Sequence, residues 1–190
     1  MKKHRLAFVD LETTGLDAMK HEIIDIGIII AEQHEDLFGG RSLHYVSEHE
    51  IYLTPLHIER ADPKALAINK YTKRDWSRAV GQKEGLSEAA RILTDTIFVA
   101  QNVTFDWTFL YISGNTYGVN FDKAVYYHKL DLASMAFGKL YHNSDLSRFT
   151  LRELTVHFGV ANTDAHTAIS DARATFEVAK KILELPDATT

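Results

Sequence analysis

The most constraining feature of the sequence is an apolar segment over residues 22–32, which contains six isoleucines and no regular alternation with polar residues. This pattern is typical of a β-strand that is covered on both faces. The continuous apolar part, residues 23–31, contains Asp25 and is much shorter than the ~20 residues that span a bilayer. The sequence therefore predicts a central, buried strand and no membrane segment.

Short apolar segments and helical patterns alternate along the rest of the chain. We expect strands over residues 5–10, 22–32, 43–53, 97–100 and 125–130, with a turn at Gly39 and Gly40. We expect helices after the Asp62 cap, over residues 87–94, around Phe105, Phe109 and Ile112, over 131–141, over 150–158 and over 167–185. Three strands followed by strands that alternate with helices indicate an α/β fold with a mixed sheet.

Two of these helices carry sharper local signals. Thr150 and Glu153 form a capping-box pattern, and Gly159 is expected to end that helix. In the last helix the residues expected to face inward are Ala168, Ala172, Phe176, Val178, Ala179 and Ile182.

Composition bounds the class of protein. The 190 residues are 45% hydrophobic and 11% aromatic, so we expect one domain over residues 1–190 with a core of about 5–184. The absence of cysteine excludes disulfides, thiolate zinc sites and a cysteine nucleophile. The basic N-terminus lacks the apolar run of a signal peptide, so we expect a soluble, cytoplasmic protein.

The net charge of −5 disfavours a protein that coats nucleic acid, because such proteins are usually strongly basic. Binding to nucleic acid would then need a small footprint, bridging metal ions or a local basic face. An enzyme with an acidic site is compatible with this charge.

Asp10 and Glu12 form the first chemical motif, at the end of the first expected strand. If the strand reaches Glu12, both side chains point to the same side of the sheet. Two adjacent carboxylates repel each other unless a cation lies between them, and oxygen-only ligands suit Mg²⁺ or Mn²⁺. Solvated acids that cap the following turn are the alternative.

Two further motifs follow later in the chain. Asp106 lies near the start of a helix that follows a buried strand, where an acid can also serve simply as a helix cap. His166 precedes Asp171 by five residues. On a regular helix two side chains at this spacing point ~140° apart, so they cannot face the same way. We therefore expect Asp171 to be a fixed ligand and His166 to lie at the start of the helix. Taken alone, without the other motifs, His166 would be interpreted as an ordinary surface or core histidine.

Taken together, the three motifs resemble the three exonuclease motifs of the DnaQ-like, or DEDDh, family of 3′–5′ exonucleases. The resemblance covers about residues 5–184 and is most specific over residues 9–16, Val-Asp-Leu-Glu-Thr-Thr-Gly-Leu. It implies a ribonuclease H-like fold, with a central mixed sheet flanked by helices. A related branch carries tyrosine four residues before the last aspartate, where this chain has Thr167, so the histidine branch is favoured.

The resemblance also implies a mechanism. Asp10, Glu12 and Asp171 hold one Mg²⁺ or Mn²⁺ ion, Asp10 shares a second, and Asp106 assists through water. Two such ions neutralise the anionic phosphodiester and stabilise the entering and leaving oxygens. His166 acts as the general base toward the attacking water, a task that suits histidine.

For the substrate, the resemblance implies binding of the 3′ end of DNA or RNA. The candidate binding residues are Thr13, Leu16, Asn102 and Phe105. The second motif begins with Gln101 where the family usually has histidine, so contacts to the terminal nucleotide can differ. Two alternatives stay open: a proofreading subunit that acts with a polymerase, and a catalytically silent nucleic-acid-binding module. The end of the chain at Thr190, a few residues after the last helix, favours a freestanding enzyme.

Overall fold

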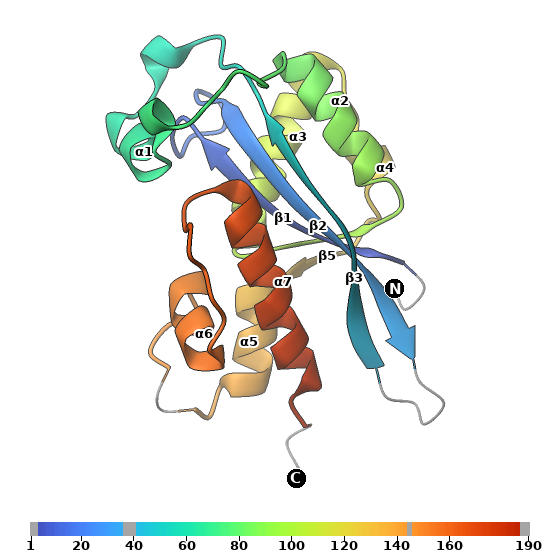
Figure 1. Ribbon diagram of the computed structural model, residues 1–190. Coiled ribbons are helices and arrows are strands. Elements are labelled where there is room, and N and C mark those ends of the chain that lie inside the picture. The colour runs from blue at the N-terminus through green and yellow to red at the C-terminus, as the bar shows by residue number, and fades with distance from the viewer. Residues whose placement is uncertain (1–3, 36–40, 144–145, 187–190) are drawn as a thin grey trace.

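The computed structural model describes residues 4–35, 41–143 and 146–186, which form a five-stranded sheet with helices on both faces (Figure 1). The strands are β1 Leu6–Thr13, β2 Ile23–Glu35, β3 Arg41–Tyr52, β4 Ile97–Ala100 and β5 Lys129–Asp131. Their order is β3-β2-β1-β4-β5; β2 is antiparallel to β1 and β3, and β4 is parallel to β1 and β5. This is the mixed sheet that the sequence predicts.

The α-helices lie between and after the strands. They are α1 Pro63–Ile68, α2 Gln82–Ile92, α3 Val103–Tyr117, α4 Phe121–Ala124, α5 Leu132–Leu140, α6 Leu151–Phe158 and α7 Ala168–Glu184, with short 3-10 turns at Ile58–Arg60 and Tyr71–Lys73. Within the described ranges, no helix has the length and apolar character needed to cross a membrane.

The two faces of the sheet carry separate apolar cores. Leu6 and Phe8 of β1 point to the face covered by α5, α6 and α7, where the Phe8 ring packs edge-on against Phe176 at 5.3 Å. Ala7 and Val9 point to the opposite face, toward α2 and α3. Because side chains alternate along a strand, every even-numbered residue of β1 up to Glu12 lies on the α7 side.

Gly27 brings the start of α7 against the sheet. Gly27 pairs with Asp10 across β1 and β2, and a Cβ atom at position 27 would collide with the backbone of Ala168 and Ile169. Only a residue without a side chain permits this approach. The close contact places the N-terminus of α7 beside the acidic end of β1.

Several local predictions are confirmed. The Asp62, Asp131 and Thr150 side chains cap α1, α5 and α6, and Gly159 ends α6 with a φ of 63°. All six residues expected on the inward face of the last helix are buried. The turn expected at Gly39 and Gly40 lies outside the described residues.

Several predicted elements have different bounds in the structure. β1 continues to Thr13 rather than ending at residue 10, and α2 begins at Gln82 rather than at residue 87. The strand expected over 125–130 is shorter and lies later in the chain, since β5 comprises Lys129–Asp131. Before that strand the chain forms a short helix that the sequence did not predict, α4 Phe121–Ala124, which Asn120 caps by accepting from the Lys123 amide at 3.0 Å.

Candidate active site

The acidic end of β1 supplies two carboxylates on the α7 side of the sheet. Asp10 and Glu12 follow Leu6 and Phe8 in the alternation, and Glu12 pairs with Asp25 of β2. Both acids are only partly buried, so they lie at the rim of the apolar core rather than inside it. Because β1 extends to Thr13, it includes Glu12, and Asp10 and Glu12 therefore lie on the same side of the sheet.

Asp106 joins them from the first turn of α3. Its side chain is 3% exposed, and its Oδ1 accepts from the Leu11 amide at 3.1 Å. Leu11 lies between Asp10 and Glu12, so this bond ties α3 to the acidic end of β1. α3 starts at this point because Asn102 adopts a left-handed conformation, with a φ of 61°, which turns the chain from β4 into the helix.

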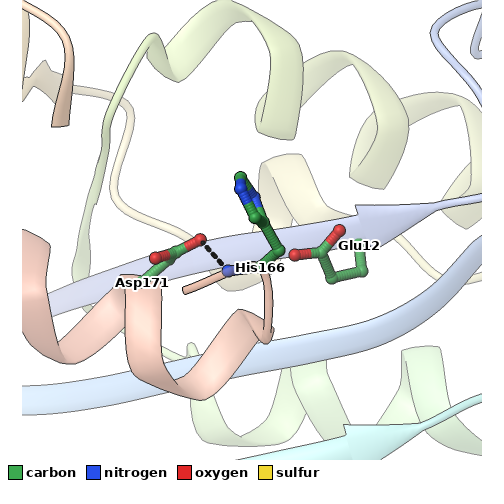
Figure 2. Close-up of side chains that lie close together, drawn as sticks. All are labelled: Glu12, His166 and Asp171. Atoms are coloured by element: carbon green, nitrogen blue, oxygen red, sulfur yellow. Dashed lines mark hydrogen bonds between the residues drawn. The ribbon is translucent and has the colours of Figure 1, made fainter. Parts of the chain in front are cut away.

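The segment before α7 contributes His166 and Asp171. The His166 amide donates to Asp171 Oδ2 at 3.1 Å, and Asn162 Nδ2 donates to Asp171 Oδ1 at 2.6 Å. Glu12 on β1 and Asp171 on α7 lie on either side of His166 (Figure 2). Glu12, His166 and Asp171 each offer one possible ligand atom, and these atoms lie within 4.8 Å of one another.

Three of the site carboxylates, Asp10, Glu12 and Asp106, have raised pKa values. Burial raises the pKa of Asp10 well above its ordinary value, and the charges of Asp106, Asp171 and Glu12 raise it further. Burial and the charge of Asp171 raise the pKa of Glu12 to about 8, although Arg74 partly offsets them. Burial also raises the pKa of Asp106, against the hydrogen bond from Leu11. A cation among these groups would relieve both repulsion and desolvation.

A groove between the segment after β1 and the first turns of α3 contains most of the residues expected to bind substrate. Leu16, Asn102 and Phe105 line it together, and its volume is about 540 Å³. The Leu16 side chain is 79% exposed, and the Phe105 ring packs on Phe109 at 4.9 Å. Thr13 is different, because it is buried and its Oγ1 donates to the Gly15 carbonyl at 2.7 Å.

A family model described as Exonuclease, RNase_T, matches residues 7–179, which contain every residue of the acidic cluster. This chain belongs to the DnaQ-like exonuclease family. The match begins within β1, spans β2 to β5 and α1 to α6, and ends within α7.

Relatives of this exonuclease domain are parts of much larger proteins. It is 28% identical over 178 residues to "DNA polymerase III PolC-type" of Thermotoga maritima, covering 93% of this chain and 12% of that protein. It is 29% identical over 178 residues to "3'-5' exonuclease DinG" of Staphylococcus saprophyticus, covering 94% of this chain and 18% of that protein.

Solved structures agree on the fold of this exonuclease domain. E. coli Exonuclease I in complex with a dT13 oligonucleotide superposes with a TM-score of 0.76 at 18% identity, over 96% of this chain and 41% of that one. The apo form of Exonuclease I gives a TM-score of 0.76 at 16% identity, over 96% of this chain and 44% of that chain. The exonuclease, ribonuclease H-like fold expected from the sequence is thereby confirmed.

Sequence reasoning missed other residues around this site. Met19, 81% exposed, lines the same groove as Leu16. Asn162 holds Asp171, and Asp25 is fully buried directly across from Glu12. Asp25 carried a usable signal, since a lone acid inside an isoleucine run must have a buried partner. Asn162 had no such sequence signal, because it lies in a loop without hydrophobic periodicity.

Proposed function

We propose that this exonuclease domain removes nucleotides from the 3′ end of DNA or RNA by metal-dependent phosphodiester hydrolysis. One observation carries the proposal. Three segments far apart in the chain, β1, the start of α3 and the start of α7, bring Asp10, Glu12, Asp106, His166 and Asp171 to one end of the sheet. A structural role alone gives no reason to gather four carboxylates, three of which, Asp10, Glu12 and Asp106, have raised pKa values.

The donor set fits divalent cations that prefer oxygen. In the proposal Asp10, Glu12 and Asp171 hold one Mg²⁺ or Mn²⁺ ion. Asp10 also shares a second ion, which Asp106 supports. Bound there, the two ions supply charge neutralisation of the phosphodiester and of the oxygens that enter and leave. The raised pKa values of Asp10 and Glu12 support this assignment, because crowded acids bind a cation in place of protons.

His166 is the proposed general base. Its side chain is exposed beside Glu12 and Asp171, and its backbone is anchored through the bond from its amide to Asp171. An exposed imidazole next to the acids can accept a proton from the attacking water and release it to solvent. Asn162 supports this arrangement by fixing the other Asp171 oxygen.

The groove of Leu16, Asn102 and Phe105 is the proposed site for the terminal nucleobase. Its exposed apolar side chains, Leu16 and Met19, offer surface against which a base can stack or pack. Asn102 adds an exposed amide at the start of α3. Thr13, although buried, fixes the turn that carries Leu16 by its bond to Gly15.

Digestion of oligonucleotides labelled at either end tests this function. Wild-type protein with Mg²⁺ or Mn²⁺ should release single nucleotides from a free 3′-hydroxyl. A 3′-phosphate should slow release strongly and a 5′ block should not. Internal cuts in a circular single strand, or equal sensitivity to blocks at both ends, would contradict exonuclease action from the 3′ end.

Proofreading alongside a polymerase is the second candidate. The similarity to PolC-type DNA polymerase III favours it. A proofreading enzyme should remove a mispaired 3′ terminus from a primer-template faster than a paired one, because the mispaired end frays more readily into a single strand. Equal rates on the two duplexes would leave the freestanding exonuclease as the better description.

A further inference from the structure

One short segment contacts β1, β2 and the loop that precedes α7. Asn69, 1% exposed, donates from its Nδ2 to the Thr13 carbonyl of β1 at 3.1 Å. Lys70 Nζ donates to Asp164 Oδ1 at 2.9 Å and to the Ala165 carbonyl at 3.3 Å. Arg74 forms an ion pair with Asp25 of β2 at 2.5 Å. We call residues 69–74 the clamp segment.

Arg74 connects the clamp segment to the start of α7 through Asp25. Asp25 Oδ2 accepts from Arg74 Nη2 and also from the Ala168 amide at 3.2 Å. The Asp25 side chain is 0% exposed, so its charge depends on Arg74 for compensation. The Arg74 guanidinium lies 4.9 Å from the ring centres of both Tyr52 and Trp76, which restrict its movement.

His166 lies between the two points that the clamp segment holds. Lys70 fixes residues 164 and 165 on one side, and the Arg74–Asp25 pair fixes Ala168 on the other. His166 itself has a φ of 68°, a left-handed conformation that is unfavourable for a residue with a side chain. Such a conformation persists only where the surroundings hold it.

We propose that Lys70 and Arg74 are positioning residues, which hold His166 in this conformation beside Glu12 and Asp171. The proposal rests on the proposed function, because it assigns the clamp segment a role in the same reaction. Lys70 and Arg74 act through the backbone on either side of His166 and need not touch the substrate. The strained backbone then serves to direct the imidazole toward the acids.

The test compares variants of Lys70 with a variant of Lys73, which lies on the same turn, and with a variant of Arg74. Lys70→Ala removes both bonds to residues 164 and 165, whereas Lys70→Arg keeps a cation that can reach them. Lys73→Ala is the matched control, since within the described ranges the Lys73 side chain has no hydrogen bond or ion pair to the site segments. Arg74→Lys keeps the charge against Asp25 but loses the planar contact with Tyr52 and Trp76.

Two readouts separate positioning from simple folding. Lys70→Ala should lower kcat by ~10-fold with little change in KM, since small displacements of a reacting group reduce turnover strongly. Hydrogen exchange at the amides of residues 165–168 should become faster, while exchange in β1 and β2 stays unchanged. Lys70→Arg should recover most of the loss, Arg74→Lys should show a smaller loss, and Lys73→Ala should match wild type in both readouts.

A double-mutant cycle measures the coupling between Lys70 and Asp164. If Lys70 acts through Asp164, then Asp164→Ala should also reduce kcat, and the double variant should lose little more than either single variant. Additive losses, or a Lys70→Ala variant that matches Lys73→Ala in turnover and exchange, would overturn the inference while leaving the exonuclease function intact. Inactive wild-type protein would contradict the proposed function instead, and the exchange rates would then decide whether the clamp segment holds residues 165–168.

Discussion

At the scale of single residues, Asp171 and His166 differ in how firmly their side chains are held. Both oxygens of Asp171 accept hydrogen bonds, from Asn162 and from the His166 amide. The His166 ring is exposed, and only its backbone is anchored. This difference favours a fixed ligand at position 171 and a movable base at position 166.

Asp171→Asn should abolish hydrolysis of a labelled oligonucleotide. The substitution keeps the size of the side chain and its contact with Asn162 but removes the charge proposed to hold the metal ion. The measurement is product release with Mg²⁺, together with calorimetric titration of Mg²⁺ into protein freed of metal. Asp122→Asn, at an exposed acid in α4, is the control. Near wild-type turnover in Asp171→Asn would refute its assignment as a ligand.

His166→Ala should lower turnover by ~10²–10⁴, the usual contribution of a positioned general base. Metal affinity of the metal-free protein should change little, because the role proposed for His166 is proton transfer. This experiment is decisive, since the ring nitrogen lies within 4.8 Å of the acid oxygens and is close enough to be a ligand. A loss of metal affinity comparable to that of Asp171→Asn would make His166 a ligand, and another base would be required.

How far the sequence predicts residues depends on whether their signal is local. Asp10, Glu12 and Asp106 were identified from their position after expected strands, and the structure brings them to one end of the sheet. Arg74 could not be found in this way, because its partner Asp25 lies 49 positions earlier and pairs with it only in the folded chain.

At the scale of elements, the site depends on how closely α7 approaches β2. The approach needs Gly27, whose missing side chain leaves room for the backbone of Ala168. The bond from the Ala168 amide to Asp25 then fixes the start of the helix. The position of Asp171 thus follows from a glycine in a strand that faces it.

Gly27→Ala should destabilise the protein by ~1–3 kcal/mol, the usual cost of overpacking a filled interior, because helix backbone cannot move aside as a side chain can. It should also reduce turnover by displacing the start of α7. Gly138→Ala is the control: Gly138 lies within α5 with nothing within 4 Å of an added Cβ, and alanine there should stabilise the helix by ~0.5–1 kcal/mol. Urea unfolding measures the free energy of unfolding of both variants. Equal stabilities of Gly27→Ala and Gly138→Ala would contradict the close packing of α7 against Gly27.

Elements with capping residues were the easiest to predict. Asp131 and Thr150 start helices as expected, because a cap is a local interaction. α2 starts five residues earlier than expected, and the added part contains Gly85, a poor helix former. Gly85 is instead favoured by packing, as a Cβ there would lie 2.9 Å from Leu53 Cγ. Tertiary packing therefore explains why a glycine lies inside α2.

At the scale of the whole molecule, the acidic site links stability to pH and, through the proposed ions, to metal. Burial and neighbouring charges raise the pKa of Glu12 to about 8, and burial raises that of Asp25 to about 6 despite the opposing charge of Arg74. In the unfolded chain both acids titrate near 4, so between pH 5 and pH 8 the folded state binds more protons than the unfolded state. Stability contributed by these groups is present at low pH and is lost as the pH rises through 8.

The melting temperature of metal-free protein should therefore fall as the pH is raised from 5 to 8.5 in the presence of a chelator. Mg²⁺ should restore stability most at the high end, because the ionised acids that destabilise the metal-free fold are the ones proposed to bind it. Glu12→Gln, which cannot ionise, should flatten the pH dependence and weaken the Mg²⁺ effect. Thermal unfolding, monitored by circular dichroism, measures the pH dependence, the effect of Mg²⁺ and the change in both caused by Glu12→Gln. A melting temperature that is constant or rises over this range in the chelated wild type would show that the acids of β1 are not held in the crowded state described here.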